Sequence, residues 1–203
     1  MFGLYITHPQ VQIDAAVPVP QWGLSPLGQE RAQRAASHPW AARLGRVLSS
    51  EETKARETAK ILAGASGLDV EILPSSGEND RSATGFLDPA AFEAAADWFF
   101  AHPERSFEGW ETAADAQRRI VTAVSRVLDR HDPTIPLAFI GHGGVGTLLK
   151  CHLAGQPISR AGDQPAGGGN LYVFSLSDRR LVSDWVAMES DAAAATLEAL
   201  TGR

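Results

Sequence analysis

Short apolar runs that alternate with helix-like segments constrain the fold of this chain more than any other feature of its sequence. The apolar runs cover residues 2–7, 46–50, 70–74 and 136–141, and each ends at a polar or glycine-containing loop. Their length and composition are typical of buried strands. Because strands that alternate with helices form parallel sheets covered on both faces, we predict an α/β fold, a three-layer sandwich with a mostly parallel sheet.

Capping residues predict where the intervening helices begin. Ser25 and Asp88 each precede a proline, which favours helices that start at residues 26 and 89. Ser50, which is followed by two glutamates, is expected to open a further helix that ends before Gly67. Two more helices are predicted, over residues 111–131 and over the segment that ends at Gly155.

The C-terminal part of the chain is expected to lack this alternation. The runs LYVFSL and RLVSDWVAM predict a hairpin around Ser177 and Asp178, followed by an alanine-rich helix. No internal repeat is present, and 203 residues are an ordinary length for one domain. We therefore expect residues 1–203 to form a single domain.

Composition argues against several function classes. The chain has a formal net charge of -6 and no cluster of Lys and Arg, so no nucleic-acid partner is expected. No apolar run approaches the roughly 18 residues of a membrane span, and the N-terminus does not resemble a signal peptide. A cytoplasmic location without membrane association is the default expectation. Cys151 is the one cysteine, which excludes an internal disulfide, and the oligomeric state is not predicted.

Two histidines follow predicted strands and mark a candidate site. His8 comes after residues 2–7, and His142 comes after residues 136–141. Ligands of open α/β sheets bind beyond the carboxyl ends of the strands, where Lys54 and Glu78 are also expected. A nucleophile, a cation and an acid in one cleft suit phosphoryl transfer, which depends on positioning and charge stabilisation. Each residue alone is more often structural or solvated, so the hypothesis depends on their joint placement.

The motifs around these residues resemble the histidine phosphatase superfamily, whose fold is phosphoglycerate mutase-like. ITHPQ stands where the family has Arg-His-Gly-Glu, and VLSSEETKARETAKILA is similar to its Ser-Ser-x-x-x-Arg-Ala-x-x-Thr-Ala segment. LSPLGQERA, WETAADAQRR and FIGHGGVGTLL are similar to three further family segments, in the family's order. The match around the second histidine is the most specific of the five.

The resemblance implies a phosphohydrolase that acts on small phosphomonoesters and needs no metal or cofactor. His8 would attack phosphorus and become phosphohistidine. His142 and Lys54 would hold the phosphoryl oxygens during the transfer. The expected partner is accordingly a small phosphorylated molecule or phosphate itself.

The remaining site residues are also assigned by the resemblance. Glu78 would protonate the leaving oxygen and then activate water, with Asp80 as the alternative acid. The backbone N–H of Gly143, near a helix N-terminus, would contact the phosphate. Thr7, which precedes the first histidine, is placed among the substrate-binding residues.

The predicted pocket departs from the family pattern where phosphate binding needs positive charge. Thr7 replaces the first family arginine, and Lys54 replaces the second with a point charge that cannot grip phosphate bidentately. Asp14 replaces a family asparagine, and Arg81 is the candidate that could restore the lost charge. These departures leave an alternative open: a catalytically impaired family member that binds a phosphorylated ligand or partner.

A rival motif overlaps the second histidine. Residues 141–146 read G-H-G-G-V-G, which is formally a dinucleotide-binding fingerprint between a strand and a helix. The rest of the chain is too short for a doubly wound nucleotide fold. The glycines are explained more simply if they let the backbone approach a phosphate closely.

Overall fold

The computed structural model describes residues 1–201 and contains one six-stranded sheet with the strand order β3-β2-β4-β1-β5-β6. The first four of these strands are parallel neighbours, whereas β5 runs antiparallel to β1 and to β6. The mostly parallel sheet confirms the predicted α/β fold. The strands are β1 (Phe2–Thr7), β2 (Arg46–Ser49), β3 (Val70–Ile72), β4 (Leu137–Gly141), β5 (Asn170–Ser175) and β6 (Val186–Ala187).

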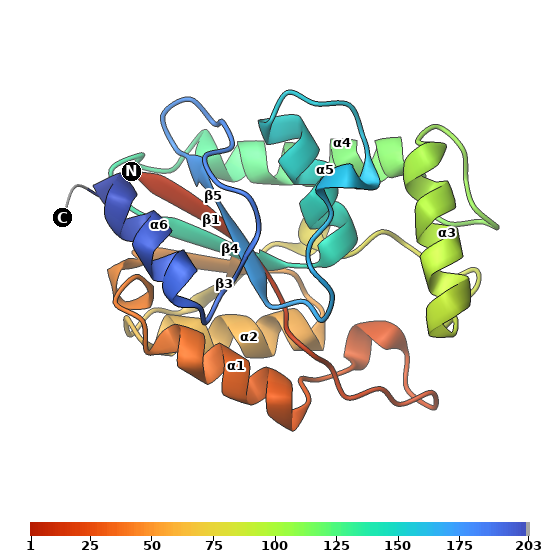
Figure 1. Ribbon diagram of the computed structural model, residues 1–203, viewed down its shortest axis with the longest axis horizontal. Helices are drawn as coiled ribbons and strands as arrows, with labels where there is room; N and C mark the ends of the chain where they lie inside the picture. The colour runs from red at the N-terminus through yellow and green to blue at the C-terminus, as the bar shows by residue number, and fades with distance from the viewer. Residues whose placement is uncertain (202–203) are drawn as a thin grey trace.

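Helices form a layer on each side of the sheet (Figure 1). One layer holds α1 (Pro26–Ala36), α2 (Thr53–Gly64) and α6 (Asp191–Thr201), and the other holds α4 (Ala113–Leu128) and α5 (Gly143–Leu153). The helix α3 (Pro89–Ala101) projects beside the carboxyl end of the parallel strands (Figure 1). Single 3-10 turns lie at Val19–Gln21, Ala41–Arg43, Pro74–Ser76 and Arg160–Gly162.

Each face of the sheet has its own hydrophobic core. Leu4 and Ile6 of β1 pack on the face covered by α1 and α2, whereas Tyr5 packs with residues of α4 and α5. Successive side chains of a strand point to opposite faces, so a strand buried on both faces must be apolar throughout. This explains why β1 is a continuous apolar run in the sequence.

The predicted N-caps of α1 and α3 are confirmed. The Ser25 hydroxyl accepts a hydrogen bond from the Gly28 N–H at 3.1 Å. The Asp88 carboxylate accepts from the N–H groups of Ala90 and Ala91, each at 3.0 Å. Both helices begin with proline at the first position, as predicted.

One local prediction is wrong, and another is confirmed only in part. The helix α2 begins at Thr53, and the hydroxyl of Ser50 contacts Nε2 of His142 instead of capping a helix. The C-terminal hairpin is also much reduced. After β5, the chain makes only an isolated bridge at Leu181 and the two-residue strand β6. Between them, the N–H groups of Val182 and Ser183 donate to the carbonyl oxygen of Val173, and Trp185 packs with Tyr5 and Tyr172 in the core.

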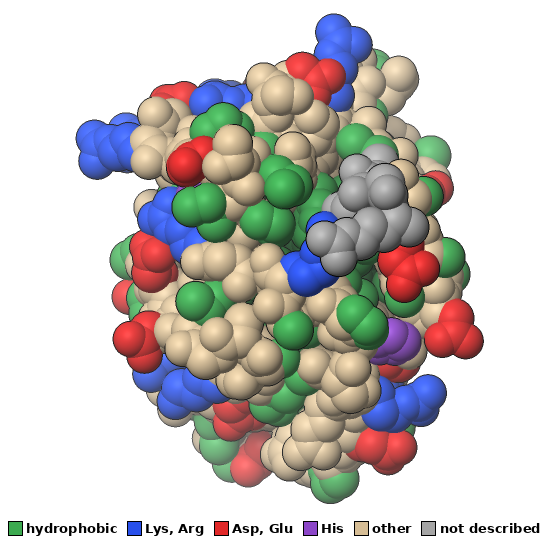
Figure 2. All heavy atoms as spheres, turned by 90° about the vertical axis from the view of Figure 1, so that its left-hand side faces the viewer, with side chains coloured by type: hydrophobic (Ala, Val, Ile, Leu, Met, Phe, Trp, Pro, Cys, Tyr) green, Lys and Arg blue, Asp and Glu red, His purple; other side chains and the backbone are tan. Residues whose placement is uncertain are grey.

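Helix length and one face of the surface bear on two of the function classes considered above. Within residues 1–201, every helix is too short or too polar to cross a bilayer. Figure 2 shows the face that carries the chain ends, where acidic and basic side chains are interspersed. No single-sign stripe that could follow a nucleic-acid backbone is visible on that face.

Candidate active site

His8 and His142 face each other at the carboxyl ends of two adjacent parallel strands. His8 directly follows β1 and His142 directly follows β4, and the two strands pair in register up to Thr7 and Gly141. The ring centroids of the two imidazoles lie 5.3 Å apart, with an interplanar angle of 67°. Strand pairing therefore brings together two residues that are far apart in the sequence, as the strand-end argument predicted.

The ring of His8 is held in one tautomer. Its Nδ1 lies 2.8 Å from the carbonyl oxygen of Pro9, which can only accept, so Nδ1 carries the proton. The lone pair of Nε2 is then free for attack on an electrophile. Burial and the neighbouring His142 lower the pKa of His8 to about 3, so the ring is neutral near neutral pH.

Lys54 lies in the first turn of α2 and is buried at the site. Its ammonium donates to the carbonyl oxygen of Val19 at 2.9 Å and forms an ion pair with Glu52. Lys54 is near enough to the two histidines for its charge to lower the pKa of each, but a carboxylate from its own segment balances that charge.

Glu52 is the site residue that the sequence did not predict. One of its carboxylate oxygens lies 3.3 Å from Nε2 of His142 and accepts a hydrogen bond from the Glu78 N–H at 3.0 Å. Burial opposes its ionisation, but His142 and Lys54 outweigh burial and lower the pKa of Glu52 to about 2. A clue was present in the sequence, because two glutamates precede Lys54, but they were interpreted as helix-opening residues.

His142 is fully buried and contacts its neighbours through one ring nitrogen. Nε2 lies 2.7 Å from the Ser50 hydroxyl, in addition to its contact with Glu52. Nδ1 is buried and has no hydrogen-bond partner among the described residues. Burial lowers the pKa of His142, and the carboxylates of Glu52 and Glu78 partly offset this effect.

Glu78 lies against the N-terminus of α5. Its two carboxylate oxygens accept hydrogen bonds from the N–H groups of Gly144 at 3.0 Å and Val145 at 2.9 Å. Glycine at position 144 lets this carboxylate approach closely, since a Cβ there would lie 2.7 Å from Oε1 of Glu78 and would displace it. Burial raises the pKa of Glu78, but Arg81, His142 and these N–H groups lower it by more, so the carboxyl is ionised.

The alternative acid, Asp80, lies further out. It is exposed, and its carboxylate accepts from the Ser82 N–H at 2.9 Å. Hydrogen bonds from Ser82 lower the pKa of Asp80.

Thr7 is buried and its hydroxyl is already engaged. The hydroxyl donates to Oε1 of Gln164 at 2.7 Å and accepts from the Asn170 N–H at 3.0 Å. Gln164 therefore lies next to the end of β1. It also lies close to Gly143, where a Cβ would be 2.3 Å from Nε2 of Gln164. Whether Thr7 or the Gly143 N–H contacts a substrate stays a prediction.

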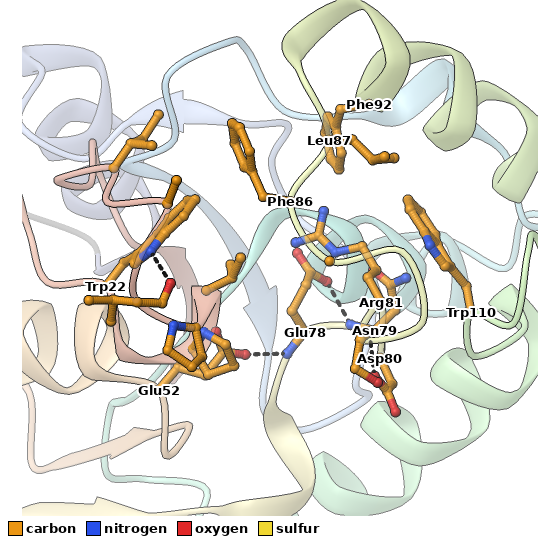
Figure 3. A pocket seen from close by; sticks show the side chains of 18 of the residues that line it. Trp22, Glu52, Glu78, Asn79, Asp80, Arg81, Phe86, Leu87, Phe92 and Trp110 are labelled. Atoms are coloured by element: carbon orange, nitrogen blue, oxygen red, sulfur yellow. Dashed lines mark hydrogen bonds between the residues drawn. The ribbon is translucent and has the colours of Figure 1, made fainter.

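Arg81 lies against two aromatic rings, and its role in phosphate binding stays a prediction. Its guanidinium carbon lies 4.9 Å from the ring centroid of Phe92 and 5.7 Å from that of Trp110. The two rings hold the cation by cation–π contact on the wall of a cleft, where it faces Glu78 (Figure 3).

The cleft next to the histidines has a volume of about 790 Å³. Its walls come from the loop after β1 and from the segment between β3 and α3. Trp22 stands on one side, Arg81 and Trp110 stand on the other, and Phe86 lies between them at the rim (Figure 3). Glu52 and Glu78 form the part of the lining that also belongs to the histidine site.

Within the described residues, no three His, Cys, Asp or Glu side chains are arranged so that they could hold a metal ion. The available groups are the neutral imidazole of His8, the imidazole of His142, the ion pair of Lys54 and Glu52, and the carboxylate of Glu78.

Two facing histidines at the carboxyl ends of parallel strands are the arrangement expected from the motif comparison. A comparison with protein-family profiles identifies the same superfamily. The profile of the histidine phosphatase superfamily (branch 1) matches residues 13–187, so the chain belongs to this superfamily. A search of curated protein sequences finds no relative.

Solved structures share the fold at low sequence identity. A mycobacterial glucosyl-3-phosphoglycerate phosphatase with inorganic phosphate is 21% identical, with a TM-score of 0.76 over 93% of this chain and 99% of that one. Bacillus stearothermophilus YhfR is 18% identical, with a TM-score of 0.74 over 93% of this chain and 99% of its own. A putative alpha-ribazole-5'-P phosphatase from Escherichia coli is 19% identical, with a TM-score of 0.69 over 94% and 96%.

Proposed function

We propose that this protein is a phosphohydrolase that removes phosphate from small phosphomonoesters through a phosphohistidine at His8. The observation that carries the proposal is the free Nε2 lone pair of His8, fixed by the Pro9 carbonyl and directed to a site shared with His142. Membership of the histidine phosphatase superfamily and the phosphatase names of the structural relatives support the same reaction.

In the first step, Nε2 of His8 attacks phosphorus and the ester P–O bond breaks. The electron pair of that bond leaves with the organic oxygen, which takes a proton from the minor protonated form of Glu78 and departs as an alcohol. The imidazole becomes a phosphorylated cation whose Nδ1–H is more acidic than before. The Pro9 carbonyl, 2.8 Å from Nδ1, stabilises that charge.

In the second step, water attacks the phosphohistidine and the N–P bond breaks. Glu78, now a carboxylate, takes a proton from the water, and the electron pair of the N–P bond returns to His8. The products are the alcohol, inorganic phosphate and the regenerated enzyme. Atoms and charge balance without a metal ion or a cofactor.

The remaining groups hold the phosphoryl oxygens. Lys54 and His142 provide the nearest cation and ring N–H, and the Gly143 N–H at the start of α5 provides a backbone donor. The Thr7 hydroxyl is a weaker candidate because Gln164 and Asn170 already engage it. The expected partner is a small phosphorylated molecule, and a cytoplasmic location stays an expectation.

A second function has one specific observation in its favour. Glu52 already pairs with Lys54 and contacts His142, so the groups that should bind a phosphate dianion face a carboxylate. A chain with this arrangement could bind a phosphorylated ligand or partner without turning it over. The labelling experiment below separates the two functions.

The experiment is rapid-quench labelling with radioactive acetyl phosphate in the presence of a metal chelator. We expect acid-labile label on the wild type and none on His8→Ala. His152→Ala is the matched control, because this exposed histidine lies at the far end of α5 and should not affect labelling. Absence of label on every folded variant would favour the binding function, and label that persists in His8→Ala would reject His8 as the nucleophile.

A further inference from the structure

We propose that the cleft beside the histidines binds an apolar, ring-bearing organic group, so that the preferred substrates are phosphomonoesters of apolar alcohols and not sugar phosphates. This inference depends on the proposed function, because it assumes that the phosphoryl group lies at His8. It adds a substrate class that neither the superfamily nor the names of the structural relatives assign to this chain.

The position of the cleft fits the organic part of a substrate. Glu52 and Glu78 line the cleft, and both also contact the histidine site, Glu52 through His142 and Glu78 through the start of α5. A phosphoryl group at His8 would therefore direct its ester oxygen past Glu78 into the cleft. The volume of about 790 Å³ is within the range of small-molecule sites and far exceeds the needs of phosphate alone.

The walls of the cleft are mainly apolar and aromatic. Trp22 and Phe86 meet across the rim with ring centroids 5.6 Å apart, and Phe92 and Trp110 form the opposite wall at 6.5 Å. Aromatic faces of this kind bind rings and aliphatic groups by burying a large apolar area. The other apolar lining residues are Ile13, Ala15, Ala16, Val17, Pro18, Val19, Pro20, Leu87 and Pro89.

Two rim residues expose apolar surface that a ligand would cover. Phe86 is 49% exposed and Ile13 is 57% exposed, although both are large hydrophobic side chains. They come from the two loops that enclose the cleft, one on each side. Exposed apolar surface that surrounds a concave site favours an apolar ligand, because binding removes that surface from water.

The polar groups of the cleft lie together near Glu78, and several of them already contact protein groups. The Glu78 carboxylate accepts from Gly144 and Val145, Arg81 stacks on two rings, and the Asp80 carboxylate accepts from Ser82. A sugar would lose hydration on entry, and the apolar walls offer no partners to most of its hydroxyl groups, which costs affinity.

One buried donor in the lining is free. Nδ2 of Asn79 is buried without a hydrogen-bond partner among the described residues. A single acceptor on the substrate, such as the ester oxygen, would satisfy this donor. The cleft thus matches a ligand with a large apolar body and one acceptor.

The test compares two primary alkyl phosphates, 3-phenylpropyl phosphate and glucose 6-phosphate, under the same conditions. Their leaving groups are both primary alkoxides, so a difference in kcat/KM reports on the organic group and not on bond reactivity. We expect kcat/KM to be at least about tenfold higher for 3-phenylpropyl phosphate, since burying a phenyl ring is worth that much or more.

Two variants test whether the cleft is responsible for the preference for an apolar substrate. Phe86→Ser should reduce the ratio of the two kcat/KM values, because it removes an aromatic rim side chain that the core does not need. Ile72→Ser is the matched control, since Ile72 is also an exposed hydrophobic residue, at 44%, but lies in β3 outside the cleft. An unchanged ratio in Phe86→Ser would overturn the assignment of the cleft.

The outcomes distinguish this inference from the proposed function. Equal kcat/KM values, or a preference for glucose 6-phosphate, would overturn the substrate class and leave the phosphohydrolase activity standing. If neither ester is hydrolysed and His8 is not labelled, the proposed function fails. In that case, the binding of non-hydrolysable 3-phenylpropylphosphonate, monitored by tryptophan fluorescence, tests whether the cleft binds an apolar group. An absence of saturable quenching would overturn the apolar cleft as well.

Discussion

The carboxylate of Glu52 lies 3.3 Å from Nε2 of His142, at the position where a histidine of this site would be expected to meet a phosphoryl oxygen. The same carboxylate pairs with Lys54, so one side chain engages two of the groups assigned to phosphate binding. Negative charge at this position opposes the binding of a dianion. The predictions below begin with the consequences of this contact.

Glu52→Gln should tighten the binding of inorganic phosphate by about tenfold or more, because a unit negative charge a few ångströms from the anion is removed. The amide can still accept the hydrogen bond from the Glu78 N–H. Isothermal titration measures the dissociation constant. Glu71→Gln is the control, since Glu71 forms its ion pair with Arg46 on the surface. Unchanged phosphate affinity in Glu52→Gln would show that Glu52 is not close to the bound anion.

Lys54→Met should destabilise the protein by about 3 kcal/mol, because it leaves the carboxylate of Glu52 at the buried site without its cation. The double variant Lys54→Met/Glu52→Gln should recover most of this loss, since the unpaired charge is gone. Urea denaturation of the single and double variants gives the coupling free energy. Additive effects of the two substitutions would contradict a coupled pair.

Hydrolysis of alkyl phosphates should speed up relative to aryl phosphates as the pH falls from 7 to 5. Alkoxide leaving groups need the proton of Glu78, whose pKa is lowered, so the protonated fraction rises about tenfold per pH unit. Phenolates depart without that proton. The measurement is the ratio of kcat/KM for 3-phenylpropyl phosphate to kcat/KM for 4-nitrophenyl phosphate. Because both substrates carry a phosphate group, this ratio removes the effect of phosphate ionisation. A ratio that is independent of pH would argue against Glu78 as the acid.

His8 should make stability depend on pH. Its folded-state pKa of about 3 lies below the ordinary 6.5, so the unfolded chain binds more protons between these values. The free energy of unfolding should therefore fall as the pH falls through this window, by up to about 1.4 kcal/mol per pH unit from this group. His8→Asn should flatten the curve measured by urea denaturation at pH 4 to 7. NMR titration should find the imidazole of His8 still neutral at pH 5, and a normal titration near 6.5 would contradict this prediction.

Gly144→Ala should lower the turnover of alkyl phosphates but change the melting temperature little. The new Cβ would lie 2.7 Å from Oε1 of Glu78, and that flexible carboxylate can move away without disturbing the backbone. Its displacement from the α5 N-terminus removes the acid from its position. Gly64→Ala is the control, because a Cβ at this glycine, also in a helix, meets nothing within 4 Å. Turnover unchanged in Gly144→Ala would mean that Glu78 does not act from this position.

The sequence allowed the prediction of the elements that carry the site but not all of its chemistry. The placement of His8 and His142 followed from two apolar runs, because the ends of parallel strands meet at one edge of a sheet. The direction in which Glu52 points could not be predicted. The direction of Glu52 depends on where α2 starts. The helix starts at Thr53, three residues after Ser50, and the Ser50 hydroxyl contacts His142 and does not cap the helix.

The sequence by itself determined the strand and helix pattern, the caps of α1 and α3, and the residue types that meet at the strand ends. These features are local, since periodicity and capping act over a few neighbouring residues. Only the tertiary structure decided that Glu52 neutralises Lys54, that Glu78 is held ionised at α5, and that two distant loops enclose an apolar cleft. Those properties arise from contacts between segments far apart in the chain, and pairing, burial and charge balance exist only once the segments are packed together.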